Sequence, residues 1–201
     1  VLGQQVLMGR MNLPAPVATQ QISFSDYQQL AYLAQTNPGA LSPEQLAILQ
    51  APFIPYNLDA WDGYFVEREI VLETALSLDK NLVVLAGDTH NAWANNLQTV
   101  QGVDVGVELA TSSVSSPGLE AFFPAEDPDA LSAGVTQIIE PLHYANLQHR
   151  GYLVARFSAT ECRGEYRFVN TVKSETYQLL EDYAKDIKVL PGAGNRIILD
   201  A

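Results

Sequence analysis

One stretch decides the fold: Asn81-Leu82-Val83-Val84-Leu85-Ala86-Gly87-Asp88-Thr89-His90-Asn91. Its apolar run, with polar residues at both ends, predicts a central strand over residues 82–88 that is covered on both faces. Open sheets that contain such strands bind ligands at the carboxyl ends of the strands. Asp88 and His90 stand at that end, two residues apart, so a nearly extended backbone would point both side chains to the same side.

Asp88 and His90 offer an oxygen donor and a nitrogen donor, and such a pair can form half of a metal site. The alternative is structural: Asp88 caps the following turn, and His90 packs beside Trp93. An isolated Asp-x-His pair favours this structural alternative. The rest of the chain reverses the preference.

The composition is that of one folded domain or of a large part of a bigger one, with 201 residues, 47% hydrophobic and 17% charged. A net charge of -12 argues against binding to nucleic acid, which requires clustered Lys and Arg. No apolar run approaches the ~20 residues of a transmembrane segment. Cys162 is the only cysteine, so an intrachain disulfide is excluded.

Local signals predict the elements of the first half. Residues 1–8 read as a strand, and a chain that opens in mid-strand without a signal peptide is expected to be a fragment. Ser25 is expected to cap one helix. Ser42 is expected to cap a second, with Gln45 closing a capping box. Asp62 is expected to cap a longer helix that precedes the central strand.

The second half is expected to contain a strand with one apolar face at 102–109, a helix at 130–139, a hairpin of residues 151–158 and 165–172, and a last helix within 174–187. Residues 91–97 read as a short turn. The serines of residues 111–118 predict a polar loop, because the Gly-x-Ser-x-Gly pattern of a nucleophile is absent.

Five groups of residues, in family order and spread over most of the chain, resemble the C-terminal half of the alkaline phosphatase D family. They are Val1–Gln5, Trp61–Tyr64 with Arg68, Leu85–His90, Glu108–Ser113 with Ser116–Gly118, and His149–Tyr152. Members of this family are metal-dependent phosphomonoesterases and phosphodiesterases with a calcineurin-like metallophosphoesterase core. The resemblance implies an α/β fold, the C-terminal half of a two-layer mixed β-sheet sandwich flanked by helices. Residues 1–201 would then be the C-terminal part of one catalytic domain.

The resemblance also implies site residues. Asp88 and His90 match the family's last ligand-bearing motif, so both are expected to bind metal and to act in catalysis. Members are reported with iron and calcium, and wider relatives use manganese or zinc. Asn91 could bond a phosphate oxygen or cap the turn, and Arg150 could bind phosphate through its planar fork or be a charge at the start of a strand. The family resemblance alone suggests a periplasmic or secreted protein. No signal sequence in this chain indicates it.

The chain departs from the family in lacking the motifs that carry the other metal ligands, which lie N-terminal to its first residue. Two donors cannot saturate an ion that takes roughly four to six ligands. His143 and His149 could in principle contribute donors to the site, but each is expected to be a surface or second-shell histidine. Cys162 is expected to be inert in a hairpin loop. Trp61–Tyr64 is most simply a helix start, although Tyr64 could approach the rim of the active site, as could Arg68.

We therefore expect a metal-dependent phosphoesterase of small phosphate esters whose remaining ligands come from an N-terminal segment of the same protein. This chain alone is then expected to be inactive. The alternative is a non-catalytic binding or structural module that keeps the sheet but lacks a complete metal site. The residues do not distinguish a monoester, a diester or a phospholipid as the substrate.

Overall fold

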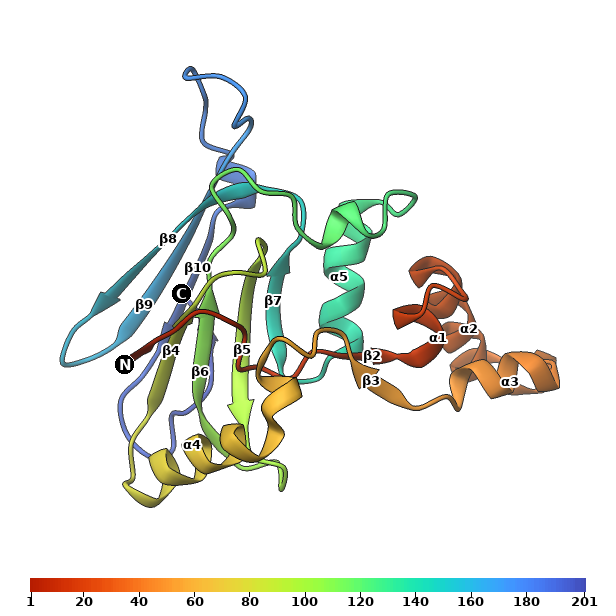
Figure 1. The fold of residues 1–201 in the computed structure, drawn as a ribbon, viewed down its shortest axis with the longest axis horizontal. Coiled ribbons are helices and arrows are strands. Elements are labelled where there is room, and N and C mark those ends of the chain that lie inside the picture. Colours follow the sequence, from red (N-terminus) through yellow and green to blue (C-terminus); the bar gives the residue numbers. More distant parts are fainter.

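The computed structural model describes residues 1–201, and its two main β-sheets pack face to face (Figure 1). The larger sheet has five strands in the order β1-β4-β6-β5-β7. Their bounds are Leu2–Gly3 for β1, Leu82–Ala86 for β4, Asp104–Ala110 for β6, Ala92–Gln98 for β5 and Leu142–Asn146 for β7. β1, β4 and β6 run parallel, whereas β5 is antiparallel to both neighbours. The predicted mixed α/β architecture is confirmed.

The second sheet is antiparallel, with four strands in the order β11-β10-β9-β8. Their bounds are Leu199–Asp200 for β11, Lys185–Val189 for β10, Cys162–Val169 for β9 and Arg150–Phe157 for β8. Between the sheets lies an apolar core to which Val83, Val107 and Leu109 contribute from one side. Phe168 and Ile187 contribute from the other. Burial of these side chains is the main force that holds the two layers together.

Helices cover the outer face of the five-stranded sheet. Helix α4 (Phe65–Ser77) places Leu72 against Val84 and Val105, and all three side chains are buried. Helix α5 (Pro128–Ile138) lies along β7 (Figure 1). The chain also forms four short 3₁₀ helices: η1 Pro38–Ala40, η2 Trp61–Tyr64, η3 Leu119–Ala121 and η4 Glu181–Tyr183. None of the helices has the length and apolar character that crossing a membrane requires.

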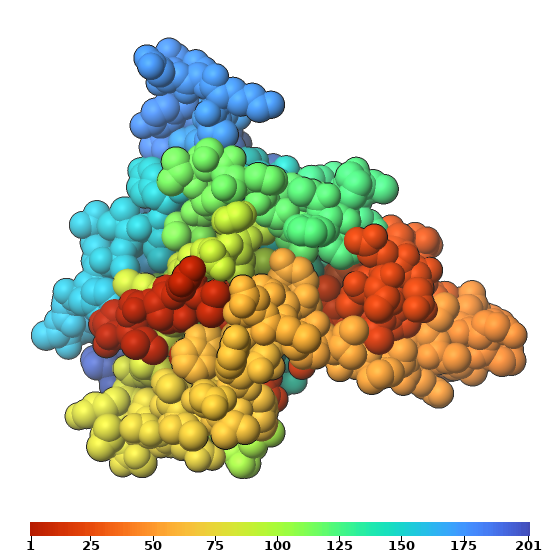
Figure 2. All heavy atoms as spheres, viewed as in Figure 1, coloured from red at the N-terminus to blue at the C-terminus, as the bar shows by residue number.

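A smaller lobe projects from one side of the sandwich, in red and orange at the right of Figures 1 and 2. It contains β2 Asn12–Pro14, α1 Ala15–Ala18, α2 Phe24–Thr36, α3 Pro43–Leu49 and β3 Phe53–Pro55. Phe24 and Leu13 of this lobe belong to the same buried cluster as Trp93 of β5 and Leu131 of α5. The lobe is therefore anchored to the sheet through a continuous apolar core.

The loop of residues 4–11, after β1, is tied down by a buried carboxylate. Glu108 of β6 is fully buried, and it accepts hydrogen bonds from the N–H groups of Met8 at 2.6 Å and Gly9 at 2.9 Å. Asn95 donates to the same carboxylate at 3.2 Å. Burial raises the pKa of Glu108 to about 7, and the N–H donors of Met8 and Gly9 oppose that rise.

The segment that begins at Trp61 holds the other side of this loop. Arg68 is buried and donates from Nε to the carbonyl oxygen of Met8 at 2.6 Å. Asp62 accepts a hydrogen bond from the Met11 N–H at 2.8 Å. The alternative that Arg68 approaches the rim of the active site is therefore wrong, because its guanidinium is buried and bonded to the Met8 carbonyl and the Glu69 carboxylate.

Several predicted elements are confirmed with shifted ends. The capping box of Ser42 and Gln45 is present at the start of α3, with both hydrogen bonds made. Strand β4 ends at Ala86, earlier than predicted, and Leu85 is only partly buried. Helix α2 is capped by Ser23, whose hydroxyl accepts from the Asp26 N–H at 3.0 Å, and not by Ser25.

Two element predictions are wrong. Residues 91–97 do not form a turn, because 92–98 make β5, a strand that pairs on both sides. The strand was not predicted because its sequence is rich in amide side chains, which are uncommon in buried strands. One of them, Asn95, is buried and donates to Glu108. Residues 174–187 do not form a helix either. They contain η4 and the start of β10, where Ile187 and Val189 alternate toward the core.

Three further details differ from expectation. The first strand covers only residues 2–3, since the following residues form the loop bound to Glu108. Asp62 does not cap α4, because its carboxylate bonds the Met11 N–H instead. Cys162 lies at the start of β9 and is buried in the core between the sheets, not in the hairpin loop.

Candidate functional site

The candidate site is built on the turn of residues 87–91, between the carboxyl end of β4 and the start of β5. Asp88 and His90 have φ angles of 63° and 64°, in the left-handed region. Asp and His enter this region more readily than most residues, yet it carries a free-energy cost that recurs at functional sites. The turn is not extended, so the spacing argument for a shared side does not apply. The directions of the two side chains are instead set by the left-handed backbone conformation of Asp88 and His90 in the turn.

The imidazole of His90 is held from one side. Its Nδ1 atom lies 2.7 Å from the carbonyl oxygen of Pro117. Because a carbonyl oxygen only accepts, Nδ1 carries a proton, and in the neutral ring the lone pair is on Nε2. Nε2 has no hydrogen-bond partner in the chain, and the side chain is partly exposed. This is the arrangement in which histidines bind metal ions.

The structural alternative for the pair does not describe this turn. Asp88 is exposed, and its carboxylate makes no hydrogen bond or ion pair, so it caps nothing. Trp93 is fully buried, and its indole N–H donates to Thr89 Oγ1 at 2.9 Å. The His90 side chain is partly exposed.

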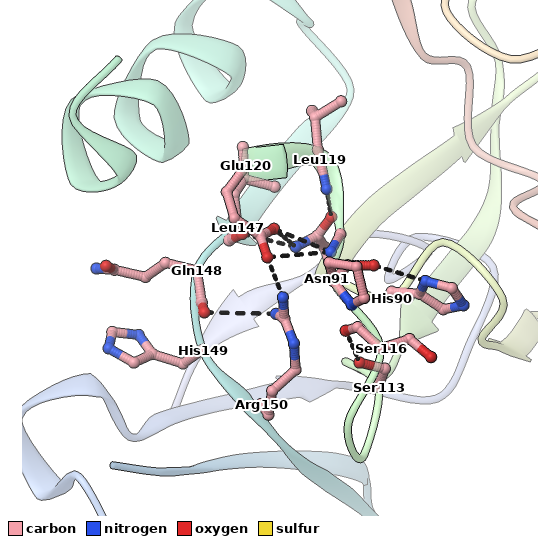
Figure 3. A network of polar contacts seen from close by, with 12 residues as sticks. His90, Asn91, Ser113, Ser116, Leu119, Glu120, Leu147, Gln148, His149 and Arg150 are labelled. Carbon is pink, nitrogen blue, oxygen red and sulfur yellow. Dashed lines mark hydrogen bonds and ion pairs between the residues drawn. The ribbon is translucent and has the colours of Figure 1, made fainter. Parts of the chain in front are cut away.

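The loop of residues 113–120 lies against the end of the turn, at His90 and Asn91 (Figure 3). The Ser113 N–H donates to the carbonyl oxygen of His90 at 3.2 Å. Within the loop, Ser113 Oγ donates to the carbonyl oxygen of Ser116 at 2.5 Å. The Glu120 carboxylate accepts from the Gly118 N–H at 3.0 and 3.1 Å. These bonds fix the Pro117 carbonyl in front of His90.

Asn91 is buried and its amide is fully engaged in the protein. Its Oδ1 accepts from the Leu119 N–H at 2.6 Å, and its Nδ2 donates to the Leu147 carbonyl at 2.8 Å and to Glu120 at 3.3 Å. Gly118 packs so closely that a Cβ there would overlap the Asn91 side chain. This geometry matches the local capping role. It does not support a direct bond from Asn91 to phosphate.

Arg150 opens β8, and its guanidinium pairs with Glu120 through Nη2. Nη1 donates to the Gln148 carbonyl at 3.4 Å, and only 11% of the side chain is exposed. Arg150 thus matches the alternative of a charge at the start of a strand. Its link to Asn91 runs through Glu120 (Figure 3). A phosphate could bind Arg150 only in competition with Glu120.

The other histidines have partners elsewhere. His143 Nε2 lies 3.1 Å from an Asp200 carboxylate oxygen. The His149 ring packs against Tyr183, with 4.1 Å between ring centroids, and in Figure 3 it points away from His90. Burial lowers the pKa of His149.

Burial also raises the pKa of the Cys162 thiol, in keeping with an inert core cysteine. No group of three or more His, Cys, Asp or Glu side chains is placed to hold a metal ion together. The chain itself therefore presents the candidate pair of Asp88 and His90 and no third donor beside it.

Sequence reasoning missed Pro117 and Glu120 as parts of this site. The Pro117 carbonyl orients His90, and Glu120 joins the loop to Asn91 and Arg150. Pro117 stands within a stretch that resembles the alkaline phosphatase D family, which was the available signal. Nothing in the local sequence marks Glu120, because its partners lie far away along the chain.

Residues 1–166 match the family model described as PhoD-like phosphatase. The chain belongs to the PhoD-like phosphatase family. It is also 30% identical over 117 residues to alkaline phosphatase D of Bacillus subtilis (strain 168), a match that covers 56% of this chain and 19% of that protein. The predicted resemblance is thus confirmed.

A solved structure described as "Structure of PhoD" shares the fold. It aligns with a TM-score of 0.63 over 100% of this chain and 31% of its own, at 18% sequence identity. The chain thus spans under a third of the PhoD structure and about a fifth of the Bacillus subtilis protein. At this identity the structural match demonstrates a common fold alone.

Proposed function

We propose that this chain forms part of the active site of a metal-dependent phosphoesterase that hydrolyses small phosphate monoesters or diesters. Membership of the PhoD-like phosphatase family supports the reaction class. The observation that carries the proposal is the 2.7 Å contact from His90 Nδ1 to the Pro117 carbonyl. It leaves Nε2 free to meet a ligand, and the exposed Asp88 carboxylate stands two residues earlier in the same turn.

The donor chemistry fits the expected ions. An imidazole suits iron or zinc, and a carboxylate also suits manganese and calcium; we propose iron and calcium as the first choice, with the imidazole on the iron. Such ions, when bound, polarise a phosphoryl oxygen and lower the pKa of a bound water. The residues that would hold them are His90, through Nε2, and Asp88. The Pro117 carbonyl would hold the proton on Nδ1 and fix the orientation of the His90 ring.

The remaining ligands are proposed to come from an N-terminal segment of the same protein. Two observations support this: no third donor stands beside Asp88 and His90, and the relatives are much longer than this chain. Residues 1–201 would then be the C-terminal part of one metallophosphoesterase-like catalytic domain, inactive without its partner segment. Family relationships suggest a periplasmic or secreted enzyme. The net charge of -12 disfavours nucleic acid as substrate.

The test compares the 201-residue chain with a longer protein that also contains the N-terminal segment. Each is loaded with Fe, Ca, Mn or Zn in turn and assayed on an aryl phosphate monoester and diester. We expect metal-dependent turnover by the longer protein and none by the chain alone. Turnover by the chain alone would show that the missing donors are not needed.

A second candidate is a non-catalytic module, favoured by the lack of a third donor in the chain. It predicts that the longer protein binds no stoichiometric metal and hydrolyses neither ester, while keeping the same fold by circular dichroism. Metal analysis together with intact mass separates the two functions in one preparation.

A further inference from the structure

An apolar groove opens beside the candidate site. It has a volume of about 340 Å³ and lies between the 113–120 loop, the start of β8 and the segment that follows β9. The last of these segments projects from the molecule, at the top of Figure 2. The side chains that form its apolar lining are Val114, Tyr152, Val169, Val172 and Tyr177. A volume of this size suits a small organic group.

The lining is unusually apolar for an accessible surface. Val114 is 81% exposed and Tyr177 is 58% exposed, while Tyr152 and Val172 also present much of their surface to solvent. Contiguous exposed apolar side chains mark binding surfaces. No Lys, Arg, Asp or Glu lines the groove. A charged group placed there would meet the hydroxyl groups of Ser115, Thr171 and Ser174 but no side chain of opposite charge.

Two of the three segments that border the groove are linked to the turn that carries His90 by backbone hydrogen bonds. The Ser113 N–H donates to the His90 carbonyl at 3.2 Å, and the Gly151 N–H donates to the Ser113 carbonyl at 3.3 Å. Val114 and Tyr152 are the next residues after Ser113 and Gly151. The 113–120 loop and the start of β8 are therefore attached by backbone hydrogen bonds to the frame that positions the imidazole.

We propose that this groove binds the apolar alcohol portion, an aryl or short aliphatic group, of the phosphate ester. This inference rests on the proposed function, because it places the phosphoryl group at Asp88 and His90. Tyr152 and Tyr177 supply flat surfaces on which an aromatic group can pack, and the valines complete an apolar wall. The groove then selects apolar esters over esters of polyols such as glycerol.

The test compares kcat/KM for naphthyl phosphate and for glycerol phosphate, using the longer, metal-loaded protein. Tyr152→Ala and Tyr177→Ala each remove one aromatic wall. The matched control is Phe157→Ala, because Phe157 ends the same strand and is 48% exposed, against 47% for Tyr152. We expect the ratio of the two kcat/KM values to fall about 10-fold in each groove variant and to stay unchanged in Phe157→Ala.

A binding measurement separates this proposal from the proposed function. 2-Naphthol carries no phosphate, so its saturable fluorescence change reports the groove alone. Binding that Tyr152→Ala and Tyr177→Ala abolish, in a protein without turnover, supports the groove and overturns the phosphoesterase. Turnover with an unchanged substrate ratio in both variants, and no naphthol binding, overturns the groove and leaves the phosphoesterase intact.

One further outcome concerns a different occupant. If another segment of the longer protein covers the groove, both tyrosine variants lower the melting temperature of that protein while the substrate ratio stays constant. That result overturns the proposal, since the apolar side chains would then belong to an internal contact.

Discussion

The carbonyl oxygen of Pro117 lies 2.7 Å from Nδ1 of His90, although 27 residues separate them in the chain. This contact decides which ring nitrogen can meet a ligand. The Pro117 carbonyl is in turn fixed by Glu120, which binds the Gly118 N–H and pairs with Arg150. Substitutions along this path should therefore affect the site in graded and distinguishable ways.

The first prediction concerns the metal. In the longer protein, His90→Ala should lower metal content and reduce turnover at least about 100-fold, since one proposed ligand is lost and second-shell substitutions alone typically cost 10–100-fold. His143→Ala is the control, because His143 bonds only Asp200 at the protein surface. Metal analysis and ester hydrolysis measure both variants. Equal metal content in His90→Ala and in wild type would refute the ligand assignment.

The second prediction tests the packing of Gly118 against Asn91. Gly118→Ala should lower the free energy of unfolding by about 1–3 kcal/mol, because the new Cβ overlaps the buried amide. Gly39→Ala is the matched control, since a Cβ at Gly39 meets nothing within 4 Å. Urea unfolding at one pH measures both. A Gly118→Ala protein as stable as wild type would mean that the loop does not pack as described.

The third prediction asks what Arg150 does. If its ion pair with Glu120 is structural, Arg150→Gln and Glu120→Gln should each destabilise the protein, and the double variant should cost little more than either one. The KM for a phosphate ester should then stay close to the wild-type value. A large rise in KM with unchanged stability would instead restore Arg150 as a phosphate ligand.

The fourth prediction follows from Glu108. Burial raises its pKa from 4.5 to about 7, so the folded protein holds this proton more tightly than the unfolded chain. The resulting stabilisation is greatest below pH 4.5 and is lost as the pH rises to 7. Between pH 5 and 8 the loss should be about 2–3 kcal/mol.

Glu108→Gln should lack this term, so the stability difference between wild type and variant should move in favour of the variant as the pH rises. Urea unfolding of both proteins at pH 5 and pH 8 measures the change. A constant difference at the two pH values would mean that Glu108 does not titrate in this range.

The fifth prediction compares two arginines. Arg68→Gln should cost about 3–5 kcal/mol, because it breaks a buried pair with Glu69 and frees the Met8 carbonyl. Arg156→Gln should leave the free energy of unfolding nearly unchanged, since its pair with Glu165 is exposed. Thermal melts of the two variants would contradict the structure if they were alike.

Several features follow from the sequence by itself. The capping box of Ser42 and Gln45 and the apolar strand of residues 82–86 could be predicted, because caps and apolar runs act over a few neighbouring residues. The family could be recognised from short motifs, and the model match over residues 1–166 confirms it. The candidate pair of Asp88 and His90 came from the same motifs, and its role as a metal site stays a prediction.

Only the tertiary structure decided the rest. The buried Asn95 is accommodated in β5 because its amide donates to Glu108 in the neighbouring strand. Glu108 in turn accepts from the N–H of Met8, which lies 100 residues earlier in the chain. Asn91 is buried and His90 is oriented because the 113–120 loop closes over both. Local secondary-structure propensities depend on neighbouring residues and cannot predict contacts between residues so far apart in the chain. A buried amide or carboxylate becomes stable only when the folded chain brings its distant hydrogen-bond partners into place.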